Sequence, residues 1–406
     1  MNRNKAFAVL LAMLFSTLIF ADETQDRTLR LKIGNPKLKN KTLEIVPGKI
    51  FSAQSSQVVS FGEMIKEMKD SRFIYVGETH DSLPMHDIQF KIAEALYQQN
   101  HKLAIGLEMF DVEWQKPLNK WSLGLLYQEE FLDESQWYVN WNFNFNYYEK
   151  IFTLAKENKV PMYALNAPRK IIRKIRILGW ESLTDEEKKY VPKPDLSNQD
   201  HRQLMQTIFE DMEMPEAMKG HGDIMYKAIY RAQSAWDEVM AANTLRAANI
   251  EKRRILVLAG SGHLIYNLGI NRRAFEKQSS PYKTVISVVV PSGQDKIIVS
   301  RSIGDYIWGL REEDKPAYPS VGISLKKFDG LDNPVIEKEP ILGAAKGKNF
   351  KQGDVILSVD GKRFFSINKL RTYFSKFSWG DELTFKLLRE AKEIEVKLKF
   401  EYIKLP

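Results

Sequence analysis

Ionisable side chains follow directly on three apolar runs of this sequence. Glu78 and His80 come just after Phe73–Gly77, while Glu108 and His263 follow two later runs. Carboxylates and imidazoles serve as general acids and bases when neighbouring charges tune their pKa values, and both are ligands for divalent metal ions. These residue types therefore predict a site for acid–base chemistry, for a metal ion or for a metal porphyrin.

The apolar runs have the character of buried strands, because they are short and rich in β-branched and aromatic residues. Segments with helical spacing separate them, which is typical of a mostly parallel sheet with helices on both faces. The carboxyl ends of parallel strands lie at one edge of a sheet, where open α/β folds keep their chemistry. We therefore expect these side chains to meet there. The predicted strands are residues 73–77, 103–107, 160–165, 254–259 and 284–290.

Two sets of roles are open for these residues. In an enzyme, Glu78 or Glu108 is the candidate general base; at a metal site, His80, His263, Glu78 and Glu108 are the candidate ligands. The alternative is structural, with the carboxylates capping helices and His263 hydrogen-bonded in the core. These residues lie at the ends of three of the first four predicted strands, and this placement favours a functional role. His86, on the following helix, lies either beside this cluster or in solvent, whereas His201 is expected in a solvated turn.

Two long insertions interrupt the predicted sheet. The first contains the aromatic-dense segment 137–148, and the second, between the third and fourth strands, is far longer than a crossover needs. We predict that they form a helical cap over the strand ends. Tyr147 and Tyr148 are candidate haem-binding residues because a tyrosinate can ligate ferric haem, and His221, between two glycines, is a candidate haem-facing residue.

The composition predicts an exported globular protein. Arg3 and Lys5 precede the apolar run 6–20, and Ala21 is a suitable small residue before a cleavage site, so residues 1–21 read as a signal peptide. We expect a periplasmic or envelope-associated protein whose mature chain has no transmembrane span. The absence of cysteine excludes disulfides, thiolate metal sites and Cys-linked lipid anchors. The net charge of +8 is spread among acidic residues and supports only a mild attraction to anionic ligands or lipid, not a nucleic-acid partner.

Residues 318–402 differ in character from the preceding part, because short strands alternate with turns such as Asp360-Gly361. They resemble a PDZ domain, and the resemblance implies capture of an extended peptide by its terminal carboxylate. An envelope protein or peptide would then be the partner. The predicted peptide-binding residues are Val321, Gly322, Ile323 and Ser324.

Residues from about 45 to 305 resemble the ChaN-like haem-binding uptake family of the Tiki superfamily. The resemblance implies an α/β fold, haem bound through a tyrosine, dimerisation around haem and a role in iron uptake at the cell envelope. Some relatives are lipoproteins, and a chain without cysteine departs from them. The matching segments are Val76–Asp81 with His86 and Gln89, Gly106–Phe110, Asn166–Pro168, Gln233–Ala241 and Leu258–His263.

Three hypotheses about function follow. The first is a haem-binding protein whose PDZ domain recruits a partner. The second is a metal-dependent hydrolase, because the wider superfamily contains peptidases and esterase-like enzymes that use a Glu and a His at the first strand end. The third is a non-catalytic PDZ adaptor. The predicted parts of the chain are a signal peptide (1–21), a flexible leader (22–45), an α/β domain (46–310) and a PDZ domain (318–402).

Overall fold

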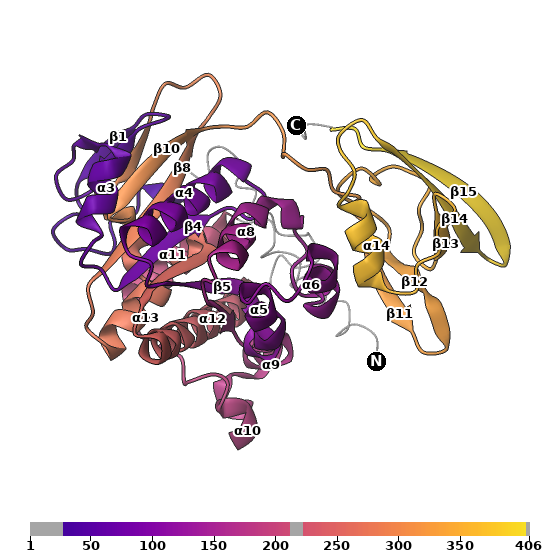
Figure 1. The fold of residues 1–406 in the computed structure, drawn as a ribbon, viewed down its shortest axis with the longest axis horizontal. Coiled ribbons are helices and arrows are strands. Elements are labelled where there is room, and N and C mark those ends of the chain that lie inside the picture. Colours follow the sequence, from indigo (N-terminus) through magenta and orange to yellow (C-terminus); the bar gives the residue numbers. More distant parts are fainter. Residues whose placement is uncertain (1–26, 212–221, 403–406) are drawn as a thin grey trace. The chain divides into compact units, whose positions relative to one another are not determined.

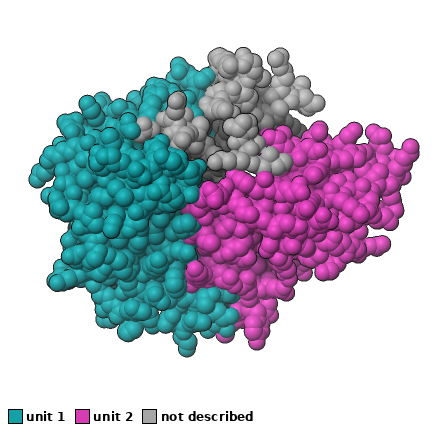
Figure 2. Space-filling view, turned by 90° about the horizontal axis from the view of Figure 1, so that it is seen from above, with its two compact units in different colours: residues 1–80, 84–124, 151–312 teal, residues 81–83, 125–150, 313–406 magenta. Residues whose placement is uncertain are grey.

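The computed structural model describes residues 27–211 and 222–402, and it divides into two compact units (Figures 1 and 2). Unit 1 comprises residues 1–80, 84–124 and 151–312, and unit 2 comprises residues 81–83, 125–150 and 313–406. The predicted signal peptide and His221 lie outside the described residues. Unit 2 is larger than the predicted PDZ domain, because it takes in the aromatic insertion of the α/β domain.

An eight-stranded sheet forms the centre of unit 1, in the order β3-β2-β10-β8-β4-β7-β5-β6. The six strands from β10 to β6 are parallel, while β2 and β3 add antiparallel pairs at one side. Apolar residues fill the parallel strands because helices cover the sheet. The bounds of the strands are β2 Ile50–Ser52, β3 Val58–Val59, β4 Phe73–Glu78, β5 Leu103–Asp111, β6 Met162–Asn166, β7 Arg254–Gly260, β8 Tyr282–Val290 and β10 Tyr306–Arg311.

Helices flank this sheet on both sides, as the sequence predicts. Helix α4 (Leu83–Gln99) follows β4, and the long helix α12 (Gly222–Glu251) packs against β5, β6 and β7 (Figure 1). Helix α9 (Arg169–Leu178) packs beside α12, so these two helices of the second insertion cover the sheet, and α13 (Ile270–Lys277), which follows β7, also packs against α12. No helix in the described part of the chain is long and apolar enough to cross a membrane.

The described part of the predicted leader is built into unit 1. Leu29, Ile33 and Leu38 are buried in its core, although lysines surround them in the sequence. Strand β1 (Thr42–Ile45) pairs antiparallel with β9 (Ile297–Ser300). Residues 27–45 are therefore not a flexible leader, because their spaced apolar side chains find a place in the core that composition alone does not reveal.

Unit 2 contains a five-stranded antiparallel sheet in the order β11-β12-β13-β14-β15, consistent with a PDZ domain. Helix α14 (Ile367–Phe374) buries Leu370 and Phe374 in the core of this unit. Strand β11 is at the edge of the sheet and lies beside α14. The bounds of the strands are β11 Ser324–Phe328, β12 Leu331–Lys338, β13 Val355–Val359, β14 Glu382–Arg389 and β15 Lys392–Lys399.

The aromatic insertion packs on this PDZ module within unit 2. Its helices α6 (Gln128–Glu134) and α7 (Trp137–Asn140) both contact α14. The buried Trp137 ring makes edge-on contacts with Phe145 and Tyr148, at centroid distances of 5.1 and 5.3 Å. The sequence predicted that the two insertions form one cap. In the structure, the aromatic insertion belongs to unit 2, whereas the second insertion packs on the sheet of unit 1.

Candidate functional site

The ends of β4, β5 and β7 bring Glu78, His80, Glu108 and His263 together in unit 1. Glu78 pairs in register with Gly260 across β4 and β7, and Leu107 pairs with Leu258 across β5 and β7. Because all three strands are parallel, the residues that follow them emerge at the same edge of the sheet. We call this group of four residues the rim.

Glu78 holds two histidines with its two carboxylate oxygens. Oε1 lies 2.7 Å from Nδ1 of His80, and Oε2 lies 3.0 Å from Nε2 of His86. Nδ1 of His86 lies 3.0 Å from Oε1 of Gln89, whose amide donates to the carbonyl of Val76. Burial would raise the pKa of Glu78, but the two imidazoles outweigh it and hold that pKa well below the usual range. Glu78 is therefore a carboxylate at neutral pH, and His86 belongs to the cluster.

Glu108 and His263 form the second pair of the rim. Oε1 of Glu108 lies 3.3 Å from Nε2 of His263, and Oε2 accepts a hydrogen bond from the Gly260 amide at 2.6 Å. Oδ1 of Asp237 lies 2.6 Å from Nδ1 of the same imidazole. Burial would lower the pKa of His263, but the flanking carboxylates raise it to about 10. The ring is therefore an imidazolium that donates from both nitrogens.

The two pairs meet at Gly260. A Cβ atom on this glycine would lie 3.0 Å from Cε1 of His80 and 3.6 Å from Oε2 of Glu108, so a side chain there would press on both pairs. Burial lowers the pKa of His80, whereas the negative charges of Glu78 and Glu108 raise it and prevail. The rim is thus one electrostatically connected cluster.

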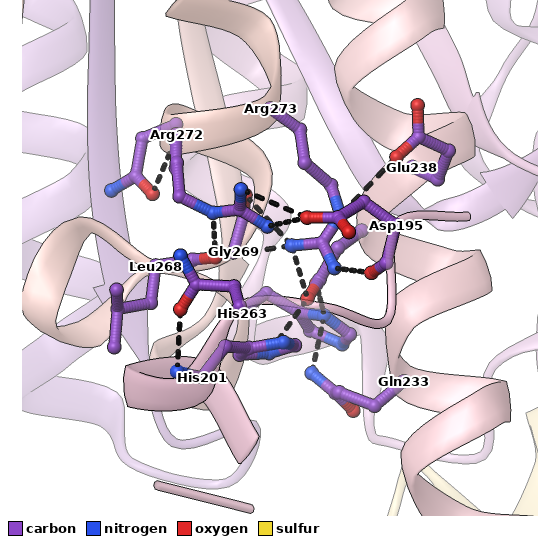
Figure 3. Close-up of polar contacts among 12 residues, drawn as sticks. Asp195, His201, Gln233, Glu238, His263, Leu268, Gly269, Arg272 and Arg273 are labelled. Atoms are coloured by element: carbon purple, nitrogen blue, oxygen red, sulfur yellow. Dashed lines mark hydrogen bonds and ion pairs between the residues drawn. The ribbon is translucent and has the colours of Figure 1, made fainter. Parts of the chain in front are cut away.

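A network of buried charged side chains contacts His263 through Asp237 (Figure 3). Oδ2 of Asp237 lies 3.3 Å from Nε2 of His201 and 3.6 Å from Nη1 of Arg273. Arg273 also contacts Glu238 through Nε at 3.3 Å. The expectation that His201 is solvated is wrong, since this side chain is fully buried. Burial lowers the pKa of His201 below its ordinary value.

Asp237 is a residue of this site for which the sequence predicted no role. It lies on α12, one helical turn after Gln233, whose side-chain amide lies 2.8 Å from Nδ1 of His263. Both residues are buried among apolar positions of that helix. Polar residues four apart on a buried helical face were the available sign, because such residues must find polar partners.

The predicted haem-binding tyrosines, Tyr147 and Tyr148, belong to unit 2. Both are buried, with hydroxyls in hydrogen bonds: Tyr147 accepts from the Tyr318 amide at 3.3 Å, and Tyr148 accepts from Nε1 of Trp141 at 2.9 Å. Burial also raises the pKa of Tyr147 far above its ordinary value. The haem-binding role of these two residues stays a prediction.

Tyr127 differs from these two tyrosines in its exposure. Its side chain is 80% exposed, and Leu125, two residues earlier, is 66% exposed. The sequence shows no sign of this exposed tyrosine, because Tyr127 lies outside the aromatic-dense segment 137–148.

The described residues, 27–211 and 222–402, contain no group of three or more His, Asp or Glu side chains arranged to hold a metal ion. In the rim, imidazole nitrogens contact carboxylate oxygens. Nδ1 of His80 contacts Glu78, and the two nitrogens of His263 contact Glu108 and Asp237. The geometry therefore describes hydrogen-bonded ion pairs.

The predicted peptide-binding residues lie together at the start of β11. Val321 and Ile323 are buried, and Gly322 has a left-handed φ of +79°. A Cβ atom on Gly322 would lie 1.9 Å from the carbonyl oxygen of Leu342, so only glycine fits this close approach. Ser324 begins the edge strand itself.

Comparison with known proteins assigns both parts of the chain. Residues 64–274 match the family described as haem-binding uptake, Tiki superfamily, ChaN. Residues 319–400 match the PDZ domain family. No curated protein sequence matches the chain.

Several solved structures are similar in fold to parts of this chain. ChaN of Campylobacter jejuni with cofacially bound haem is 21% identical over 64% of this chain and 95% of its own, with a TM-score of 0.49. A mutant of the erythromycin esterase EreC in its open conformation is 13% identical over 62% of this chain and 82% of its own (TM-score 0.36). The HtrA-type protease AlgW with a decapeptide is 17% identical over 22% and 31% (TM-score 0.20). Since the family match spans more than half of its length, this chain belongs to the ChaN haem-binding uptake family of the Tiki superfamily.

Proposed function

We propose that this protein is exported, binds haem for iron or haem uptake at the cell envelope, and captures the carboxyl terminus of a partner peptide with its PDZ domain. The observation that carries the proposal is the match of residues 64–274 to the haem-binding uptake family. Export rests on the signal-peptide character of residues 1–21.

Haem is the cargo in this proposal, and Tyr127 would hold it. A phenolate oxygen is a suitable ligand for ferric iron, and the exposed Leu125 side chain would lie against the apolar porphyrin. Burial raises the pKa of Tyr147 and so makes its deprotonation unfavourable. The same exposed position would allow haem to be passed to another protein.

A hemin titration of the mature protein tests this assignment. The wild type should develop a tyrosinate-type Soret band, and Tyr127→Phe should lose that band. Tyr190→Phe, which removes another partly exposed phenol, and Tyr147→Phe are the controls and should keep it. Without a band in the wild type, haem binding would be rejected; a normal band in Tyr127→Phe would reject only the ligand.

The peptide would add to β11, which is the edge strand of the PDZ sheet. Edge strands carry unpaired backbone groups that an extended chain can join, and the amides of the loop that contains Gly322 would receive the terminal carboxylate. Peptides with a free carboxylate should bind, and the same peptides with an amidated end should not. Equal binding of both forms would argue against carboxylate capture.

Hydrolysis is a second candidate function, and the rim favours it. Glu78 orients His80 through Nδ1, while the protonated His263 lies at 3.3 Å from Glu108. An oriented histidine can transfer a proton, and a fixed imidazolium can stabilise a developing negative oxygen. A screen of ester and peptide substrates, with and without added divalent metal, tests this idea. Glu78→Gln should abolish any activity and leave the Soret band unchanged.

A further inference from the structure

The aromatic insertion, residues 125–150, contacts two parts of the PDZ module that a bound peptide would need. One is helix α14, which lies beside β11, and the other is the chain that enters the loop around Gly322. All of these residues belong to unit 2. The contacts are made by polar groups with defined geometry as well as by aromatic packing.

Asn368 is the main polar contact between the insertion and α14. Its side chain is 1% exposed, accepts a hydrogen bond from the Tyr138 amide at 2.9 Å and donates to the carbonyl of Leu132 at 2.9 Å. Arg371, one turn later, donates to the carbonyl of Tyr138 at 2.6 Å. A buried amide with both hydrogen-bonding groups paired fixes the rotation and position of its helix, because any shift leaves buried polar groups unpaired.

Tyr147 makes the contact at the other side of the site. Its hydroxyl accepts from the Tyr318 amide at 3.3 Å, and the two rings meet edge-on at a centroid distance of 4.8 Å. Tyr318 is three residues before Val321. The following loop is tightly built, since Ala345 donates to the carbonyl of Val321 at 2.9 Å. Fixing Tyr318 therefore fixes the path by which the chain enters this loop.

We propose that residues 125–150 hold the peptide-binding site of the PDZ domain in its binding geometry, with Asn368 and Tyr147 as positioning residues. Asn368 holds helix α14 against the insertion, and Tyr147 holds the entrance to the Val321-Gly322-Ile323 loop. The inference rests on the proposed peptide binding and extends it, because the PDZ domain would need a segment of the α/β domain sequence to be complete.

The physical reason lies in preorganisation. A peptide that joins β11 and packs beside α14 gains affinity only if the strand, the loop and the helix already have their bound positions. Each neutral hydrogen bond that holds such a group changes affinity about five- to tenfold when it is lost, provided that the group becomes mobile. Losing the insertion contacts should therefore weaken peptide binding without any direct contact to the peptide.

Hydrogen exchange of the full mature chain tests the positioning roles without a ligand. Asn368→Ala and Tyr147→Leu should speed amide exchange in residues 320–328 and 367–375 at least tenfold, and exchange in β4, β5 and β7 should stay unchanged. Tyr147→Phe, which keeps the ring, should restore most of the protection. Lys386→Ala, in β14 of the same unit and with an exposed side chain that pairs with Glu393, is the control and should resemble the wild type. Unchanged exchange in Asn368→Ala and Tyr147→Leu would overturn the inference.

Peptide binding provides the second readout. The probe is a mixture of fluorescein-labelled ten-residue peptides that end in Val, Leu or Phe with a free carboxylate, measured by fluorescence anisotropy. Asn368→Ala should bind about tenfold more weakly than the wild type, and Lys386→Ala and Tyr373→Phe should bind as tightly as the wild type. If the wild type binds none of these peptides while the exchange result holds, the peptide function fails and the structural role of the insertion stands. Wild-type affinity in Asn368→Ala would overturn the inference.

Discussion

Nδ1 of His263 lies 2.6 Å from Oδ1 of Asp237, a carboxylate without exposed surface. Asp237 is also near His201 and Arg273, so one buried negative charge faces three nitrogen-bearing side chains. Burial would raise the pKa of Asp237, but His201 and His263 hold this pKa far below its ordinary value. The stability of unit 1 and the charge of the rim therefore depend on the same carboxylate.

Asp237→Asn keeps the shape of this side chain and removes its charge. We expect the free energy of unfolding to fall by about 3–5 kcal/mol, because a buried cation loses its partner. Guanidinium denaturation of the mature chain measures the change. The control is Glu44→Gln, which breaks the exposed pair with Lys296 and should cost no more than about 1 kcal/mol. Equal effects of the two substitutions would contradict a special role for Asp237.

The raised pKa of His263 predicts loss of stability at alkaline pH. The imidazole has a pKa of about 6.5 in the unfolded chain and about 10 in the folded protein. Its stabilising contribution is therefore complete below pH 6.5 and is lost as the pH rises toward 10. Between these values the wild-type free energy of unfolding should fall, whereas His263→Gln should show a smaller slope. Denaturation series at several pH values compare the two proteins, and parallel curves would refute the assignment.

There is a physical reason why the rim residues could be predicted from the sequence. Glu78, Glu108 and His263 each follow an apolar run, and parallel strands bring such positions to one edge whatever the sequence between them. Their partners were harder to find. His86 and Asp237 lie on helices, and only helix packing decides whether such a residue points to the rim or to solvent.

The division of the chain into units could not be predicted in the same way. The contact between Asn368 and the Tyr138 amide joins residues 230 positions apart, and neither residue stands out in its local sequence. The aromatic insertion was predicted to be a cap because its apolar side chains must pack against some surface. The sequence does not show whether that surface belongs to the α/β sheet or to the PDZ module. Ile33, in the predicted leader, is likewise buried against residues that its local sequence does not identify.

Gly260 offers a direct test of the packing between the two rim pairs. A Cβ atom there would lie 3.0 Å from Cε1 of His80, which is tighter than ordinary contact, so Gly260→Ala should displace the imidazole. We expect a loss of about 1–3 kcal/mol in unfolding free energy, as for other overpacked sites. The His80 ring resonances should also shift in NMR spectra. Gly262→Ala is the control, because its Cβ would meet nothing within 4 Å. Matching spectra of Gly260→Ala and the wild type would show that the rim tolerates the methyl group.

Gly322 and Gly330 separate two effects of a glycine in the PDZ domain. Both have left-handed backbone, with φ of +79° and +81°, so alanine is strained at either position by about 1–2 kcal/mol. Only at Gly322 would the new Cβ meet backbone, 1.9 Å from the carbonyl oxygen of Leu342. Gly322→Ala should therefore abolish binding of the free-carboxylate peptides described above.

Gly330→Ala should keep peptide binding while losing a similar amount of stability from backbone strain. Anisotropy titration and guanidinium denaturation of the same samples measure both quantities. Loss of binding in both variants would mean that general destabilisation of unit 2 is responsible. Loss in Gly322→Ala alone would locate carboxylate capture at the Val321-Gly322-Ile323 loop, because the control carries the same backbone strain without the close approach to Leu342.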